Sequence, residues 1–404
     1  IAQREAANEA QDLRRSAIDG FSVGMDFTSF SGNDQIKYGF EMLGNQTDFS
    51  FVNNIGRTIE QVQNTTELAG YFDYRINAGK FIIEPSFRVQ YYASLSTVSP
   101  EPRLGFKYNV SDDFRIKAAA GVYSQNLISA NSDRDVVNLF SGFLTGPEHL
   151  QETFVNQDGS VKDITHKLQK ANHFILGFEE DITENIELNV EGYFKDFTQL
   201  SNINRNKIYD VNDDTKPEEL RNDFIVETGE AYGVDFVITY RFEHLNFWTV
   251  YSISKVTRWD GMQEYRTVFD RRHNVNLVAS YTFGKDLNWE FGARWNFGSG
   301  FPFTQTQGFF EKLVFDDLTD DYTSENGELG IQYGELNSAE LPTYHRLDVN
   351  LKRKFLLTEN SILEINASCT NVYDRQNIFY FDRVSYNRVD QLPIMPSLGI
   401  SLSF

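Results

Sequence analysis

The sequence has one cysteine, no long apolar run and no excess of basic residues. Cys369 stands alone among 404 residues, so no disulfide can form within the chain, and its place in the alternating stretch ILEINASCTN favours a structural over a redox role. No stretch approaches the roughly 20 apolar residues of a membrane helix, and residues 1–20 lack the apolar core of a signal peptide. The formal net charge of −21 argues against nucleic acid as a partner.

The common signatures of catalytic sites are also missing. Neither a G-x-S-x-G elbow nor a glycine-rich phosphate loop is present. The six histidines are scattered, with no i, i+4 pair and no HExxH setting: His149, His166, His173, His244, His273 and His345. We therefore predict that the chain is not an enzyme. A surface hydrolase whose site is assembled from distant strands is the alternative, because one sequence can hide such a site.

Aromatic residues and period-two alternation are abundant. Phe, Tyr and Trp number 35, 20 and 4, or 15% of the chain. Alternating stretches run to ten residues or more, whereas strands of soluble sandwiches have about 5 or 6 residues, and a tilted membrane strand needs about 9 to 11. The stretch NVNLVASYTF is typical, with an apolar face of Val275, Leu277, Ala279, Tyr281 and Phe283 and a polar face of Asn274, Asn276, Ser280 and Thr282.

The alternation predicts about fifteen strands. They lie near 20–30, 34–51, 65–77, 81–93, 101–110, 113–125, 170–180, 185–199, 223–242, 245–258, 266–283, 287–299, 341–355, 360–372 and 394–404. Short connections rich in turn formers, such as NAGK and VSDD, take turns with longer ones, which include the segments between the strands predicted near 113–125 and 170–180 and near 185–199 and 223–242. This pattern predicts an all-β fold, a transmembrane antiparallel β-barrel with tight periplasmic turns and long external loops.

The predicted strand count is odd, whereas single-chain bacterial barrels have an even number of strands. An open edge in lipid would leave backbone groups without partners. We therefore expect that the count is off by one or that further strands precede Ile1. The final strand is predicted to descend, which brings Phe404 to the periplasmic rim.

The segment GSGFPFTQTQGFF has the character of a ligand site. It leaves a strand at the predicted external end and combines aromatic faces with amide groups, a mixture that suits sugars or peptides. These candidate ligand or partner contacts are Phe301, Phe303, Gln305, Gln307, Phe309 and Phe310. The alternative is that the loop folds on itself and buries these aromatics, or rests them on a neighbouring lipoprotein.

A weaker candidate is a calcium loop in the stretch DVNDD. Asp210, Asn212 and Asp214 have the first three ligand spacings of an EF-hand loop. Thr215 replaces the required glycine and Arg221 stands where the bidentate glutamate belongs. We therefore predict no cofactor and no tight metal site, with loosely bound calcium as the alternative to a solvated acidic loop.

Several segments resemble the barrel of a TonB-dependent outer-membrane receptor of the kind abundant in Bacteroidota, with a SusC-like form as one option. They include AGYFDYR, PRLGFKY, NHFILGFEEDI, IELNVEGYFKDF, GEAYGVDFVITYRF, DRRHNVNLVASYTFG, ARWNFGSGFPFTQTQGFFE, YHRLDVNLKRKF and ILEINASCTNVYDRQNIFYF. The resemblance implies that residues 1–404 are the C-terminal part of a 22-stranded barrel, without a separate soluble domain. The plug, the TonB-contacting segment and about seven strands would lie outside this sequence.

The resemblance further implies location in the bacterial outer membrane and TonB-dependent import of a glycan, a peptide or a metal chelate. Implied partners are membrane lipid, TonB through the absent N-terminal region, and a SusD-like surface lipoprotein. The alternative function is a receptor-like barrel without transport, acting as a scaffold subunit of a larger outer-membrane complex.

The last strand, SLGISLSF, matches an outer-membrane assembly signal. The match is carried by Ser397, Gly399, Leu402 and Phe404. Such a strand pairs with an exposed strand of the barrel-assembly machinery by β-augmentation. The alternative is that Phe404 only belongs to the lower aromatic girdle, and both roles are compatible.

Overall fold

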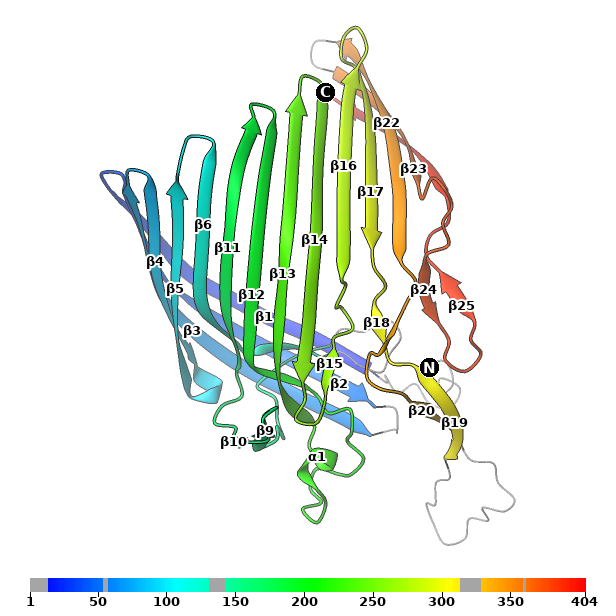
Figure 1. The fold of residues 1–404 in the computed structure, drawn as a ribbon. Coiled ribbons are helices and arrows are strands. Elements are labelled where there is room, and N and C mark those ends of the chain that lie inside the picture. The colour runs from blue at the N-terminus through cyan, green and yellow to red at the C-terminus, as the bar shows by residue number, and fades with distance from the viewer. Residues whose placement is uncertain (1–13, 54–56, 131–141, 313–327, 359–360) are drawn as a thin grey trace.

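Fifteen long antiparallel strands form one curved sheet in the computed structural model (Figure 1), which describes residues 14–53, 57–130, 142–312, 328–358 and 361–404. In spatial order, which is also sequence order, the strands are β1 (Arg14–Ser31), β2 (Asp34–Val52), β3 (Thr58–Ala78), β4 (Phe81–Tyr92), β5 (Thr97–Asn109), β6 (Phe114–Gln125), β11 (Gln169–Thr183), β12 (Ile186–Ile203), β13 (Phe224–Phe242), β14 (Leu245–Trp259), β16 (His273–Phe283), β17 (Trp289–Gly298), β22 (Tyr344–Thr358), β23 (Ser361–Thr370) and β26 (Met395–Ser403). Each of the fifteen predicted strands coincides with one of these.

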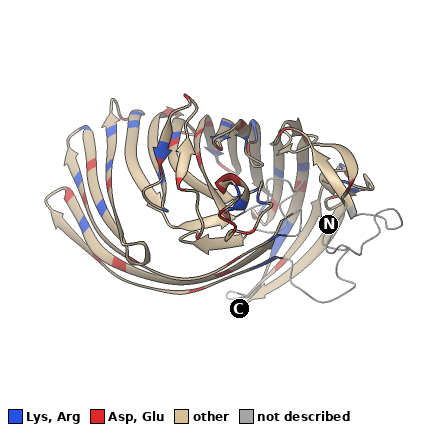
Figure 2. Ribbon diagram, turned by 90° about the horizontal axis from the view of Figure 1, so that it is seen from below, with Lys and Arg blue, Asp and Glu red and all other residues tan. Residues whose placement is uncertain are grey.

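Short and long connections alternate as predicted from β5 onward, whereas residues 53–57 between β2 and β3 and residues 93–96 between β4 and β5 are short connections at the loop end. The turns at the upper end of Figure 1 join consecutive strands tightly, and the long connections gather at the lower end. Viewed from below, the sheet wraps around loops that lie on its concave side (Figure 2). Within the described residues β1 and β26 are the two edges of the sheet and do not pair with each other.

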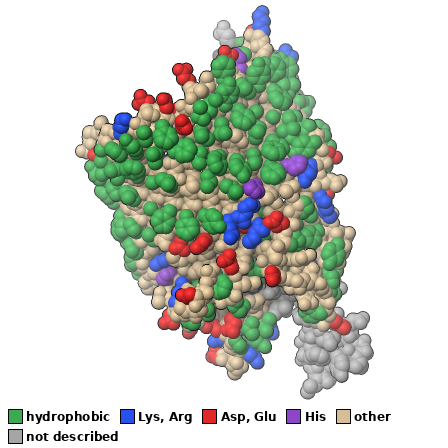
Figure 3. Space-filling view, in the orientation of Figure 1, with side chains coloured by type: hydrophobic (Ala, Val, Ile, Leu, Met, Phe, Trp, Pro, Cys, Tyr) green, Lys and Arg blue, Asp and Glu red, His purple; other side chains and the backbone are tan. Residues whose placement is uncertain are grey.

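The two faces of the sheet differ in polarity. Hydrophobic side chains cover the upper part of the convex face, and charged side chains gather below them toward the long loops (Figure 3). Strand β13 shows the pattern, because Tyr232, Phe236 and Ile238 are exposed on the convex face, and Phe236 stacks on Tyr251 of β14 with ring centroids 6.0 Å apart. Among the described residues, no helix has the length and apolarity needed to cross a membrane.

One predicted strand was wrong in its extent. Residues 266–283 were expected to be continuous, but a turn separates β15 (Glu264–Arg266) from β16. The cause is Asp270, which is fully buried. Its carboxylate accepts hydrogen bonds from the backbone N–H of Val256 at 2.9 Å and from the Arg266 guanidinium at 2.8 Å. These bonds hold the backbone away from the ladder with β14.

The long connections contain ordered elements that the sequence analysis did not predict. Their ladders pair β7 (Leu127–Ala130) with β8 (Gly142–Thr145), β9 (Thr153–Val155) with β10 (Val161–Asp163), β18 (Pro302–Phe303) with β21 (Ala339–Glu340), β19 (Thr306–Lys312) with β20 (Glu328–Tyr333) and β24 (Ile378–Phe381) with β25 (Arg388–Asp390). Two single-turn helices, η1 (Ala93–Leu95) and α1 (Glu218–Arg221), complete the described elements.

Candidate functional site

The connections at the loop end of the sheet interlock into one layer, which we call the loop layer: the described residues of 53–57, 126–168, 204–223, 260–272, 299–343 and 371–394. Hydrogen bonds join its members to one another. Asn53 Nδ2 donates to Lys207 O at 2.9 Å, the backbone N–H of Glu152 to Glu218 Oε1 at 2.5 Å, and Asn337 Nδ2 to Arg266 O at 2.7 Å. The layer is therefore a single folded surface across the end of the sheet that carries the long loops.

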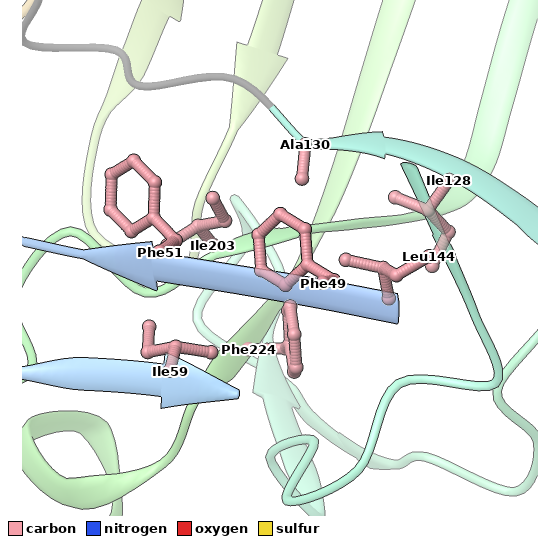
Figure 4. Close-up of a cluster of buried hydrophobic side chains, with 8 residues drawn as sticks. All are labelled: Phe49, Phe51, Ile59, Ile128, Ala130, Leu144, Ile203 and Phe224. Atoms are coloured by element: carbon pink, nitrogen blue, oxygen red, sulfur yellow. The ribbon is translucent and has the colours of Figure 1, made fainter. Parts of the chain in front are cut away.

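Strands β7 and β8 cross the concave side of the sheet, and we call this ladder the crossing ribbon. Four strands separate β3 from β12 in the sheet, which corresponds to about 24 Å along it at a spacing of about 4.8 Å. The ribbon nevertheless packs with both walls in one buried cluster (Figure 4), whose members are Phe49, Phe51, Ile59, Ile128, Ala130, Leu144, Ile203 and Phe224. It thus connects the β1–β3 wall with the β12–β13 wall.

Hydrogen bonds fix the end of the crossing ribbon and the chain that follows it. At the first wall, Gln61 Nε2 donates to Thr145 O at 2.6 Å, and Gln61 Oε1 accepts from the backbone N–H of Glu148 at 2.8 Å. Gln61 is buried, so its bond to Thr145 is shielded from water. At the second wall, beyond β8, the backbone N–H of Gln151 donates to Phe224 O at 3.3 Å.

A second buried group lies at the loop ends of β12, β13 and β14. The fully buried carboxylate of Glu227 accepts hydrogen bonds from Arg205 Nη2 at 2.6 Å, Tyr265 Oη at 2.8 Å and Arg258 Nη1 at 3.1 Å. Arg205 also pairs with Asp260 at 2.7 Å. Two guanidinium groups thus balance two carboxylates, and the arrangement ties loop 204–223 to loop 260–272.

The predicted ligand residues all lie in the loop layer but do not converge on one point. Phe303 packs edge-on against Phe381 with centroids 5.3 Å apart. The other five are exposed: Phe301, Gln305, Gln307, Phe309 and Phe310. Phe301 and Arg271 lie face to face, with the guanidinium carbon 4.0 Å from the ring centroid. Their role as ligand or partner contacts stays a prediction.

The base of this segment depends on Gly300. A Cβ at that position would lie 1.7 Å from the carbonyl oxygen of Leu341, where the backbone N–H of Leu341 donates to Phe301 O at 2.9 Å. We expect Gly300→Ala to push the two backbones apart and destabilise the loop layer by about 1 to 3 kcal/mol, the usual range for overpacking. Limited proteolysis of residues 299–343 in the purified protein would measure the loss.

Gly308→Ala is the matched control in the same loop. The nearest atom to its added Cβ is the Gln332 side-chain oxygen at 3.5 Å, an ordinary contact. Cleavage of Gly300→Ala at the rate of Gly308→Ala would show that the close approach at Leu341 is unimportant.

The predicted calcium residues have local partners instead. Asp210 Oδ1 accepts hydrogen bonds from the backbone N–H of Asn212 at 2.9 Å and from its side chain at 3.0 Å, and the first of these lowers the pKa of Asp210 most strongly. Asp214 pairs with Arg221 at 3.0 Å. In the described part of the chain, no three acidic, histidine or cysteine side chains come close enough to hold a metal ion.

The predicted assembly residues lie on the edge strand β26. Ser397 Oγ and Ser368 Oγ are 2.6 Å apart, and Gly399 stands opposite Asn366. Leu402 is exposed on the strand, and Phe404 is 95% exposed at the end of the chain. Nothing in the described residues packs on Phe404, and the role of this strand in assembly stays a prediction.

Two signals for the loop layer were present in the sequence but were not recognised. Phe49 and Phe51 continue the inner face of β2 on which Glu41, Leu43, Asn45 and Thr47 also lie, so two aromatic side chains end a face that is mostly polar. Glu227 likewise belongs to the inner face of β13 at its loop end. Apolar residues on the polar face mark the point where a loop packs inside the sheet.

Comparison with known proteins gives matches at the level of structure only. No family model matches the sequence, and no curated protein matches it. The FrpB iron transporter from Neisseria meningitidis matches with a TM-score of 0.61 and 14% identity over 96% of this chain and 55% of that one. A mutant of the ferric enterobactin receptor PfeA from Pseudomonas aeruginosa matches with a TM-score of 0.59 and 11% identity over 96% of this chain and 54% of that one. The ferric-catecholate import receptor Fiu from E. coli matches with a TM-score of 0.58 and 13% identity over 96% of this chain and 54% of that one.

These structural neighbours are TonB-dependent outer-membrane receptors. The sequence identities are low, so the likeness establishes the fold, an antiparallel β-sheet of the receptor-barrel type. The chain spans about half the length of the structures that it matches.

Proposed function

We propose that residues 1–404 form the C-terminal part of the barrel of a TonB-dependent importer in the bacterial outer membrane, without a separate soluble domain. The observation that carries this proposal is the topology: fifteen antiparallel strands in sequence order, with every long loop at one end. The apolar convex face supports a lipid environment, because barrel strands in membranes alternate apolar outward with polar inward. Transporters and receptors share this fold.

The imported ligand is proposed to be a metal chelate, a peptide or a glycan fragment. The names of the structural neighbours, a ferric-catecholate import receptor and a ferric enterobactin receptor among them, support a metal chelate first. A SusC-like importer of Bacteroidota with a SusD-like lipoprotein is the form that suits glycans. The last strand, SLGISLSF, carries the residues of an outer-membrane assembly signal, which supports delivery by the barrel-assembly machinery.

Binding of TonB tests the proposal without knowledge of the ligand. The protein would be purified in its natural length from outer membranes and titrated with the C-terminal domain of TonB from the same organism. We expect saturable binding that a peptide copy of the protein's own N-terminal segment abolishes by competition. Uptake of ⁵⁵Fe presented as ferric citrate, compared in cells with and without the gene, then examines the metal-chelate class.

The scaffold function makes the opposite prediction. Absence of TonB binding, together with stable co-purification of other outer-membrane subunits, would reject energy-coupled import and favour a barrel that organises a complex. Because the loop layer is one interlocked surface, it offers such partners a rigid docking area.

A further inference from the structure

Arg271 is held in an unusual position at the inner edge of the loop layer. Its Nε donates to Ser299 O at 3.0 Å, and its guanidinium carbon lies 4.0 Å from the Phe301 ring centroid and 5.8 Å from that of Tyr344. A Cβ at Gly298 would lie 2.4 Å from the same carbon, so the glycine makes room for the group. The guanidinium is therefore oriented by one hydrogen bond and two aromatic rings.

Among the described residues, the remaining donors of Arg271 have no partner. Within the described residues, neither of its Nη atoms has a hydrogen bond or an ion pair. The arginines on either side differ, because Arg266 and Arg272 both pair with Asp270, at 2.8 and 3.4 Å. Asp270 is fully buried and also accepts a hydrogen bond from the backbone of Val256. The carboxylate next to Arg271 in the chain is thus already occupied.

No acidic side chain among the described residues forms an ion pair with the buried Arg271 guanidinium. Burial lowers the pKa of the Arg271 guanidinium, which reflects the cost of bringing a charge out of water without an ionic partner. The stacked rings offset part of that cost. An anion bound to the guanidinium would supply a counter-charge. Because Ser299 and the two rings already hold the arginine side chain, little ordering of that side chain would remain to be paid on binding.

We propose that Arg271 is the recognition group for an oxyanion, foremost a carboxylate, on the ligand that the loop layer captures. A guanidinium presents parallel N–H donors that match a carboxylate bidentately, and the two Nη atoms are the donors left for this contact. Phe301 supports the group from one side and belongs to the predicted ligand segment. The inference rests on the proposed function, since it names the ligand class of the same surface.

Titration calorimetry with succinate as the probe tests this site on the purified, full-length protein in detergent. We expect wild-type protein to bind succinate with a Kd of about 1 mM, and Arg271→Gln to bind at least about tenfold more weakly, the loss of roughly one charge-assisted hydrogen bond. Arg271→Lys keeps the positive charge but loses the paired N–H donors of the guanidinium. It is therefore expected to bind succinate nearly as weakly as Arg271→Gln does. Succinamide, which is neutral, should give no heat with any variant.

Arg241→Gln is the matched control, because Arg241 lies on the inner face of β13 at the end with the short turns and stacks on no described ring. It should bind succinate as the wild type does. A direct readout guards against a loosened loop in the variants: succinate should slow modification of Arg271 by phenylglyoxal in the wild type, as followed by peptide mass spectrometry. Equal protection by inorganic phosphate would identify a general oxyanion site, which also supports the proposal.

Three results would overturn the proposal: equal succinate binding by wild type and Arg271→Gln, full binding by Arg271→Lys, or no protection of Arg271 by either anion. These results are separable from the TonB experiment. If succinate protects Arg271 but TonB does not bind, the anion site is supported and the proposal of TonB-dependent import is rejected. If TonB binds but neither anion protects Arg271, import is supported and the anion site is rejected.

Discussion

Phe49→Ala is expected to release the crossing ribbon from the first wall. The Phe49 side chain is fully buried between the sheet and the ribbon and lies parallel to Phe51, with ring centroids 6.5 Å apart. Truncation of such a ring to alanine removes about 3 to 5 kcal/mol, because the cavity that remains is only partly filled by its neighbours. The loss falls on the ribbon and not on the whole sheet, since the ribbon contributes only two short strands to the packing.

Amide hydrogen exchange measures this local effect. In Phe49→Ala, exchange at Ile128 and Leu144 of the ribbon should be faster by about 100-fold or more, since each 1.4 kcal/mol is a factor of ten. Phe40→Ala is the matched control, because Phe40 lies on the same strand and is 51% exposed on the convex face. Equal acceleration in both variants would mean that the ribbon is not held by the buried cluster.

The strands of the sheet could be predicted because their signal is local. In β13 the residues Tyr232, Phe236 and Ile238 alternate with Gly233, Asp235 and Thr239, which repeats the period of the pleat. The turns are local as well, since a few turn-forming residues mark each of them. The break before β16 was missed because its cause, the hydrogen bond from Val256 to Asp270, joins residues 14 positions apart.

The loop layer could not be predicted because its contacts join distant residues. Thr47 and Thr145 are 98 positions apart and lie 3.1 Å from each other at their hydroxyl oxygens, and no periodic pattern connects them. The six predicted ligand residues were placed in the correct loop region by the alternation of short and long connections. Which of them remain exposed depends on partners such as Phe381 and Arg271, which other loops supply.

The second large effect is expected from Glu227→Gln. The substitution keeps the shape of the side chain but removes the negative charge that Arg205 and Arg258 share. Removal of one partner from a buried ion pair costs about 3 to 5 kcal/mol, because Asp260 alone then remains to balance two guanidinium groups. Arg205 side-chain atoms are only 6% exposed, so water cannot easily replace the lost carboxylate. Loop 204–223 should therefore detach from loop 260–272.

Limited proteolysis within residues 204–223, combined with a double-mutant cycle, measures this loss. Glu227→Gln should be cleaved far faster than wild type. Its combination with Arg258→Met should recover part of the protection, because the cation in excess is then absent and Arg205 keeps its partner Asp260. Glu230→Gln is the control, since Glu230 is exposed on the same strand and such surface changes stay within about 0.5 kcal/mol. Strict additivity of the Glu227 and Arg258 substitutions would instead show that these two side chains do not depend on each other.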